Sequence, residues 1–212
     1  MAESTFQNVC AVLLRGGRSR RMGRDKAALP WEGGTFLQAV AWQMEMFSEK
    51  YLSVSSESTY GCGERSSDDL SGSWTILPDL IPDCGPIGGI YTALCVCRAD
   101  LALVASCDIP AVKSSLFSLL LSQAGEDADL VYPVTSEGRK HLTCAVYRKS
   151  LAPVLEGQIL AGDYRLRVLT ELCRAKGVLI EDPFYQHMLT NVNTAAELEK
   201  LNCRIGTEGS EL

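Results

Sequence analysis

The chain has 212 residues, of which 46% are hydrophobic and 22% are charged, and this is the composition of a globular protein. Its length suits one domain, and no stretch approaches the roughly 18 consecutive apolar residues that a membrane span requires. The net charge is −6, from 20 Lys and Arg against 26 Asp and Glu. An acidic chain of this kind argues against nucleic acid as the main partner.

The chain contains nine cysteines, and its first ten residues, MAESTFQNVC, lack the basic and long apolar segments of a secretory signal. An odd number of cysteines without such a signal predicts reduced thiols and a cytoplasmic location. Cys95 and Cys97 have the wrong spacing for a CxxC pair. We therefore expect most of the cysteines to be small core residues.

Strands and helices are predicted to alternate along the chain. An apolar run at residues 8–14 predicts a central strand, and apolar residues at intervals of three and four predict a helix at 35–47. A loop rich in Ser, Gly and acidic residues is expected at 56–73. Further strands are predicted at 51–55, 75–77, 101–105, 129–133, 143–147 and 177–180, and further helices at 86–97, 113–123, 164–176 and 194–201.

This alternation predicts a three-layer α/β/α domain around a mostly parallel, Rossmann-like sheet. We expect a single domain over residues 1–205 and a frayed tail at 206–212. In such sheets, ligands bind at the carboxyl ends of the strands. The polar residues that directly follow the predicted strands are therefore the candidate site.

The segment after the first strand concentrates positive charge. Six of the twelve residues from Arg15 to Lys26 are basic and one is acidic, so the segment carries +5 and the remainder of the chain −11. Gly16 and Gly17 allow a sharp turn that brings backbone amides close to an anion. The Walker and dinucleotide spacings are missing. A solvated basic turn is the alternative, but the strand and paired glycines favour a polyphosphate site.

The run Leu14-Arg-Gly-Gly-Arg-Ser-Arg-Arg-Met-Gly-Arg-Asp-Lys26 resembles the signature of the molybdenum cofactor guanylyltransferase family. That family shows LAGG, then RMG, then DK, and the resemblance implies a nucleotide-diphospho-sugar transferase-like fold. Arg15 stands where the family has alanine. The presence of a second glycine favours guanine, because the related cytidylyltransferases show LAAG, with one glycine.

Three later segments resemble the same family in the same order. Asp79 followed by GPIGGI from Gly85 is similar to the family's aspartate and GPLAGI, and a carboxylate can accept hydrogen bonds from guanine N1–H and the 2-amino group. Asp108, in CDIP, stands in the family's CDxP metal motif and would bind Mg²⁺. Asn191 and Asn193 resemble NxNTP, with Ala195 replacing the proline.

The resemblance also implies roles for individual residues. Catalysis is assigned to Arg21, Lys26 and Asp108, with Asp108 as the metal ligand. The remaining binding positions are Leu14, Arg15, Gly16, Gly17, Lys26, Ser55, Asp79, Gly85, Asn191 and Asn193. His141 matches a family histidine, although Leu142 replaces the proline that follows it in the family. It is given no catalytic role, because a lone histidine is usually a surface or capping residue.

The implied reaction is transfer of GMP from GTP to molybdopterin, with release of pyrophosphate. The implied partners are GTP, molybdopterin, and molybdoenzymes or cofactor-delivery proteins, without nucleic acid or membrane. Two alternatives stay open. The protein could use another nucleotide, such as CTP, or another acceptor, or it could bind GTP or the cofactor without turnover.

Overall fold

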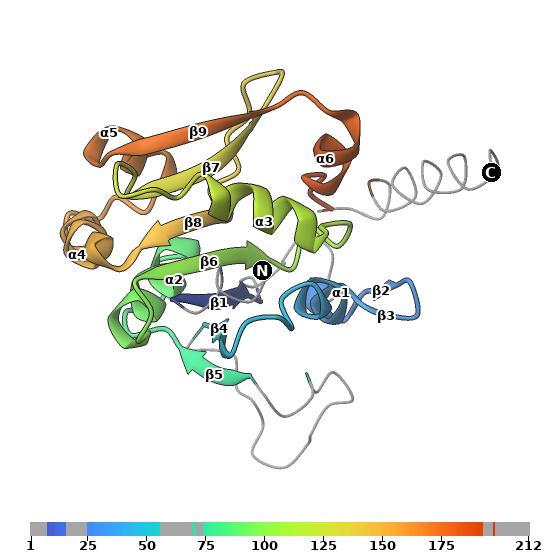
Figure 1. Ribbon diagram of the computed structural model, residues 1–212. Helices are drawn as coiled ribbons and strands as arrows, with labels where there is room; N and C mark the ends of the chain where they lie inside the picture. Colours follow the sequence, from blue (N-terminus) through green and yellow to red (C-terminus); the bar gives the residue numbers. More distant parts are fainter. Residues whose placement is uncertain (1–7, 16–24, 56–69, 71–73, 193–196, 198–212) are drawn as a thin grey trace, which may run out of the picture.

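A computed structural model describes residues 8–15, 25–55, 70, 74–192 and 197. Its core is a seven-stranded sheet in the order β5-β4-β1-β6-β8-β7-β9, which runs from bottom to top in Figure 1. The strands are β1 (Val9–Leu14), β4 (Glu49–Val54), β5 (Thr75–Pro78), β6 (Leu101–Ser106), β7 (Leu130–Thr135), β8 (Cys144–Arg148) and β9 (Ala175–Ile180). A two-stranded hairpin, β2 (Pro30–Trp31) and β3 (Gly34–Thr35), precedes the first α-helix.

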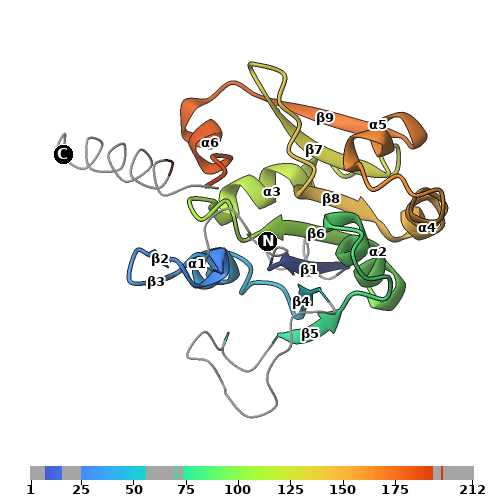
Figure 2. The same cartoon turned by 180° about the vertical axis from the view of Figure 1, so that it is seen from behind.

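Helices cover both faces of the sheet, as predicted. Along β1, Ala11 and Leu13 pack into one hydrophobic cluster while Val12 and Leu14 pack into the other, because successive side chains of a strand point to opposite faces. The first cluster includes residues of α1 (Phe36–Trp42), α3 (Ser114–Ser122) and α6 (Pro183–Met188). The second includes residues of α2 (Pro86–Val96), α4 (Ala152–Leu160) and α5 (Leu169–Leu172), and Figure 2 shows this arrangement from behind.

The sheet is mostly parallel, and β8 is its antiparallel strand. It pairs antiparallel with β6 on one side and with β7 on the other, whereas β1, β4, β5 and β6 are mutually parallel and β7 pairs parallel with β9. The residues that lead into β8 therefore lie at the edge of the sheet where its neighbours end. This reversal brings a segment from the second half of the chain to the carboxyl edge.

The predicted helix at 35–47 begins where expected but ends early. Thr35 forms a capping box with Gln38, in which the Thr35 hydroxyl accepts from the Gln38 amide and the Gln38 side chain accepts from the Thr35 amide. The helix stops at Trp42, and turns follow. Met44 and Phe47 are nevertheless fully buried, so their apolar spacing reflects burial after the helix has ended.

The helix predicted at 164–176 is wrong. This segment forms the 3-10 turn η3 (Leu166–Val168), the single turn α5, and the start of β9. Cys173 is extended, with φ −142° and ψ 174°, and Ala175 pairs with Leu130 of β7. Pairing with β7 therefore overrides the local helical pattern.

Two described helices, α4 and α6, were not predicted, nor were the β2–β3 hairpin and the short turns η1 (Lys26–Ala28) and η2 (Lys149–Leu151). The predicted loop at 56–73 and helix at 194–201 lie almost wholly outside the described residues, and the tail at 206–212 lies entirely outside them. The single domain over 1–205 stays a prediction. In the part of the chain that the structure describes, no helix is long and apolar enough to cross a membrane.

Candidate active site

The ends of four parallel strands are joined at the carboxyl edge of the sheet. The Cys107 amide, just after β6, donates to the Leu14 carbonyl at 3.0 Å, and the Arg15 amide donates to the Ser53 carbonyl at 3.2 Å. After β5, the Asp79 amide donates to the Val54 carbonyl at 3.0 Å. The predicted residues Leu14, Arg15, Asp79 and Asp108 therefore lie on neighbouring strand ends.

Asp108 follows the central strand β6 and accepts hydrogen bonds from two residues much later in the chain. The Asn191 side-chain amide donates to Asp108 Oδ2 at 2.9 Å, and the Val192 amide donates to the Asp108 carbonyl at 2.8 Å. The Arg139 guanidinium in turn donates to Asn191 Oδ1 at 3.3 Å. This chain of contacts brings the predicted residues Asp108 and Asn191 together and adds Arg139, which the sequence interpretation missed.

The second carboxylate oxygen of Asp108 is left for a ligand. Asp108 Oδ1 is buried and has no hydrogen-bond partner among the described residues. A buried carboxylate oxygen without a hydrogen-bond partner costs folding free energy, which indicates that this oxygen binds a ligand or ion. The described residues contain no group of three or more His, Cys, Asp or Glu side chains arranged to hold a metal. A single carboxylate fits Mg²⁺, which keeps several waters and takes other oxygens from substrate phosphates.

Four charged residues surround the buried thiol of Cys107. Its S–H donates to the Arg15 carbonyl at 2.8 Å. Burial raises the pKa of this thiol most; Asp108 and Asp25 raise it further, and Lys26 and Arg15 lower it. Two cations and two carboxylates thus contribute to the electrostatic environment of Cys107, near the ends of β1 and β6.

Asp79 is half-buried and lies on the other side of β4. The Ser53 hydroxyl donates to Asp79 Oδ1 at 3.1 Å. Burial raises the pKa of Asp79 to about 6, and the Ser53 hydrogen bond opposes that rise. Ser53, which the sequence interpretation passed over for Ser55, is therefore the serine that contacts Asp79. Ser53 and Ser55 are two residues apart, so an extended chain points both side chains to the same side. This spacing could have indicated Ser53 as a candidate alongside Ser55.

Three glycines shape the helix that begins beside Asp79. Gly85 precedes α2 with φ +67°, a conformation that favours glycine, and an added Cβ there would meet nothing within 4 Å. The positive φ, rather than a lack of space for a side chain among the described atoms, therefore explains why glycine occupies this position. In the first turns of α2, a Cβ on Gly89 would collide with the Ser53 hydroxyl, and one on Gly88 would lie 3.1 Å from the Ile81 carbonyl. Glycine lets α2 approach the Ser53–Asp79 pair.

The segment leading into β8 adds cations and an unpaired imidazole. Arg139 and Lys140 are exposed, whereas His141 is 6% exposed and its Nε2 has no partner among the described residues. Burial lowers the pKa of His141 to about 4, Arg139 lowers it further, and Asp108 opposes the shift. His141 is therefore a neutral side chain near pH 7 within the electrostatic reach of Asp108.

Four predicted site residues, Gly16, Gly17, Arg21 and Asn193, lie outside the described residues. Of the others, the structure brings Leu14, Arg15, Lys26 and Asp108 together around Cys107. Asp79 with Ser55 and Gly85 belongs to the β4–β5 side, and Asn191 to the β8 side. The roles assigned to individual residues stay predictions.

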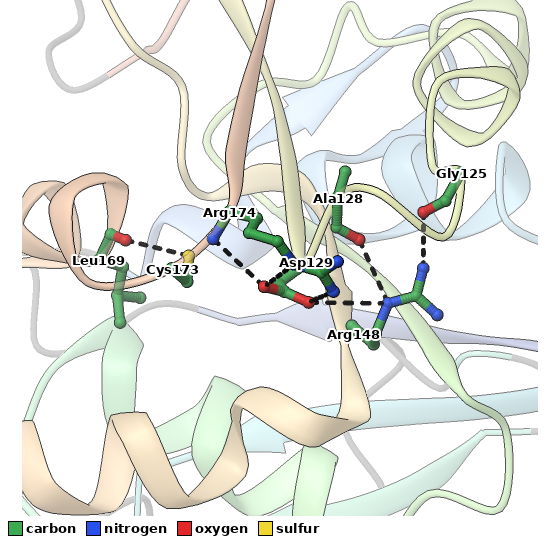
Figure 3. Close-up of polar contacts among 7 residues, drawn as sticks. All are labelled: Gly125, Ala128, Asp129, Arg148, Leu169, Cys173 and Arg174. Atoms are coloured by element: carbon green, nitrogen blue, oxygen red, sulfur yellow. Dashed lines mark hydrogen bonds and ion pairs between the residues drawn. The ribbon is translucent and has the colours of Figure 1, made fainter.

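The opposite, amino edge of the sheet carries a second aspartate with a different environment, drawn in Figure 3. Arg174 donates to both oxygens of Asp129, at 2.9 Å from Nε and 2.6 Å from Nη2. Arg148 donates to the Gly125 and Ala128 carbonyls and lies 4.0 Å from Asp129. These contacts lower the pKa of Asp129, Arg174 most, and join the start of β7 to β8 and β9.

The candidate site lies at the edge of the sheet where α/β folds bind ligands, and comparison with known proteins gives the family. Residues 11–178 match the MobA-like NTP transferase domain, so the chain belongs to that family. It is 29% identical over 202 residues to the probable molybdenum cofactor guanylyltransferase of Flavobacterium johnsoniae, covering 94% of this chain and 100% of that protein. The corresponding probable guanylyltransferase of Mycobacterium tuberculosis is 32% identical over 194 residues, covering 90% and 91%.

A solved structure supports the same fold. The molybdopterin-guanine dinucleotide biosynthesis protein A of Archaeoglobus fulgidus superposes with a TM-score of 0.75 at 24% identity, over 93% of this chain and 99% of that one. The predicted fold and family are thus confirmed. The chain is a MobA-like nucleotidyltransferase enzyme of molybdenum cofactor biosynthesis.

Proposed function

We propose that this enzyme transfers GMP from GTP to molybdopterin, giving the guanine dinucleotide form of the cofactor and pyrophosphate. The observation that carries the proposal is the position of Asp108. Its Oδ1, which has no hydrogen-bond partner among the described residues, lies at the end of the central strand β6. Arg15 and Lys26 lie toward the β1 side and Arg139 toward the β8 side. The related probable guanylyltransferases of Flavobacterium johnsoniae and Mycobacterium tuberculosis support the choice of substrates.

The nucleotide would bind on the β1–β4–β5 side of Asp108. Amides after Leu14 and the charges of Lys26 and Arg21 would hold the triphosphate, because several cations in one place stabilise a polyanion. Asp79 would accept from guanine N1–H and the 2-amino group. Guanine offers two adjacent donors to a carboxylate, whereas the Watson–Crick edges of adenine and cytosine each offer a single amino group. This difference favours GTP over the CTP alternative.

The acceptor would approach from the β8 side. Arg139 and Lys140 are exposed there, and Arg139 is tied to Asp108 through Asn191. A phosphate oxygen of molybdopterin attacks the α-phosphorus of GTP, and the bond from that phosphorus to the bridging oxygen breaks, so that the electron pair leaves with pyrophosphate. Lys26 and Arg21 stabilise the charge that develops on the leaving group.

Mg²⁺ bound at Asp108 would supply electrostatic stabilisation of the phosphate oxygens. The protein's own part is mostly positioning: Asn191 holds one oxygen of Asp108, and Arg139 holds Asn191. We place the enzyme in the cytoplasm with molybdoenzymes or delivery proteins as downstream partners. The seven cysteines that the structure describes are free thiols, which supports a reducing compartment.

The test is pyrophosphate release with Mg²⁺ and molybdopterin, compared among GTP, ATP, CTP and UTP. We expect release with GTP, and its loss in Asp108→Asn. Asp129→Asn is the matched control, because it removes the same charge from the opposite edge of the sheet. Release with CTP would instead support the cytidylyl alternative. Tight GTP binding without release from any nucleotide would support the non-catalytic alternative.

A further inference from the structure

Arg15 departs from the family pattern, in which alanine occupies this position. The Arg15 guanidinium donates to Asp25 Oδ2 at 2.7 Å. Arg15 and Asp25 are ten positions apart and bracket the glycine- and arginine-rich segment in the sequence. The side chain therefore links the two ends of that segment.

The backbone of Arg15 is fixed at the centre of the sheet. Its amide donates to the Ser53 carbonyl at 3.2 Å, and its carbonyl accepts from the Cys107 thiol at 2.8 Å. The Arg15 side chain is 17% exposed, while that of Asp25 is 49% exposed. Arg15 is thus the more buried residue of the pair, and its backbone is held by two hydrogen bonds. The position of Arg15 therefore fixes the position of Asp25.

Asp25 uses each carboxylate oxygen for a different contact. Oδ2 accepts from Arg15, and Oδ1 accepts from the Ala27 amide at 3.0 Å, which makes Asp25 the N-cap of η1. Lys26 lies between the capping residue and the amide it caps. Fixing Asp25 at both oxygens therefore fixes where the Lys26 backbone lies relative to β1.

We propose that Arg15 is a positioning residue that, through Asp25, holds η1 and Lys26 against the ends of β1 and β6 where polyphosphate binds. The proposal rests on the proposed nucleotide site for its functional consequence. It requires no contact between Arg15 and the ligand.

Two variants of the pair distinguish positioning from direct electrostatics. Asp25→Asn removes a negative charge, so electrostatics alone predicts tighter binding of a polyanion. Positioning predicts weaker binding, because asparagine replaces one of the two carboxylate oxygens with an NH₂ group, which cannot accept the hydrogen bond that this oxygen receives from Arg15 or from the Ala27 amide. The probe is inorganic tripolyphosphate with Mg²⁺, measured by calorimetry. We expect Kd to rise about tenfold in Asp25→Asn and in Arg15→Ala, which corresponds to about 1.4 kcal/mol.

The double variant Arg15→Ala/Asp25→Asn should bind no more weakly than either single one, because both act through one contact. With GTP, we expect KM to rise while kcat changes less. Glu45→Gln is the matched control: Glu45 is 44% exposed, its Oε2 accepts from Lys50 at 2.7 Å, and its Oε1 accepts from Trp74 at 3.3 Å. It should leave tripolyphosphate binding unchanged. Tighter binding in Asp25→Asn overturns the proposal.

Hydrogen exchange of the Ala27 amide tests the inference without a substrate. Arg15→Ala should speed its exchange, whereas Glu45→Gln should leave it unchanged, with thermal unfolding of each variant confirming that the fold is kept. An unchanged rate in Arg15→Ala overturns the proposal. Faster exchange with no nucleotide bound by the wild type would support the positioning role while rejecting the proposed function, so the two failures are distinguishable.

Discussion

Asp129 at the amino edge of the sheet and Asp108 at the carboxyl edge have opposite hydrogen-bonding environments. At the amino edge, Asp129 receives hydrogen bonds from Arg174 at both oxygens, and its pKa is lowered. At the carboxyl edge, Asp108 has one oxygen bonded to Asn191 and the other buried without a partner among the described residues. The amino edge is thus satisfied by its own chain, whereas the carboxyl edge retains unmet bonding capacity.

This difference distinguishes a polar group that stabilises the fold from one that serves a ligand. Asp79 and His141 belong with Asp108, because burial raises the pKa of Asp79 to about 6 and lowers that of His141 to about 4, in each case favouring the neutral form. Groups whose charged form is disfavoured by burial cluster at functional sites. Variants at both edges test whether each aspartate acts in turnover or in stability.

The largest effect is expected for Asp108→Asn. Turnover should fall about 1000-fold, as when a preorganised charged group is lost from an active site. The melting temperature should stay within about 2 °C of the wild type, because asparagine can still accept from Asn191 and the change introduces no cavity. Pyrophosphate release and calorimetry measure the two. A large fall in melting temperature with turnover retained would place Asp108 among the stabilising residues.

Asp79 is expected to govern base recognition and its pH dependence. Burial raises its folded pKa from 3.8 to about 6, and guanine donors need the ionised carboxylate, so GTP affinity should weaken as pH falls below about 6. Asp79→Asn should weaken GTP binding about 10- to 100-fold, the range for hydrogen bonds to a charged group. It should also abolish the pH dependence. Titration calorimetry from pH 5 to 8 measures both.

The comparison nucleotide is inosine triphosphate, which lacks the 2-amino group. Wild-type enzyme should prefer GTP to it, and Asp79→Asn should not. An unchanged preference in the variant would remove Asp79 from the base site.

Asp129→Asn is expected to affect stability and not turnover. The melting temperature should fall by about 3 to 6 °C, while activity per folded molecule stays unchanged. Because the folded pKa of Asp129 lies below 3.8, its stabilising contribution is complete above the unfolded value and is lost as pH falls through the folded one. Unfolding curves between pH 2 and 7 should therefore converge for wild type and variant at the acid end. A turnover defect at pH 7 would contradict the separation of the two edges.

Two helical glycines are expected to differ in their effect on stability. Gly89→Ala should cost about 1 to 3 kcal/mol, because the new methyl group displaces the Ser53 hydroxyl from Asp79. Gly157→Ala in α4 has nothing within 4 Å of the added carbon and should stabilise the protein by about 0.5 to 1 kcal/mol. Urea unfolding measures both. Equal effects at the two positions would show that α2 does not depend on a close approach to Ser53.

The sequence predicted the sheet better than the helices around it. Strands such as β1 and β6 are continuous apolar runs, buried on both faces, and their pattern is unambiguous. The error at 164–176 arose because Leu166, Leu169 and Leu172 have helical spacing, while the outcome depends on pairing between β7 and β9, about 45 residues apart. Local periodicity contains no information about that partner.

The site was predicted in part for the same reason. Asp108 and Asp79 follow strands directly, so parallel geometry brings them to one edge. Arg139 and His141 precede a strand, and they reach that edge because β8 is antiparallel, a topological fact that no short motif reports. Ser53 was passed over because two serines alternate on one strand, and contact with Asp79 depends on the register of β5 against β4.

The central position of β1 has a consequence for synthesis on the ribosome. Its six residues are fully buried and apolar, yet one of their partners, β6, lies 92 positions later, from Val9 to Leu101. At about 5 to 20 residues per second, the nascent chain must wait roughly 5 to 20 s before β6 is made. During that interval an aggregation-prone strand is without its second neighbour. Chaperone binding to nascent chains should therefore decline sharply once β6 has emerged.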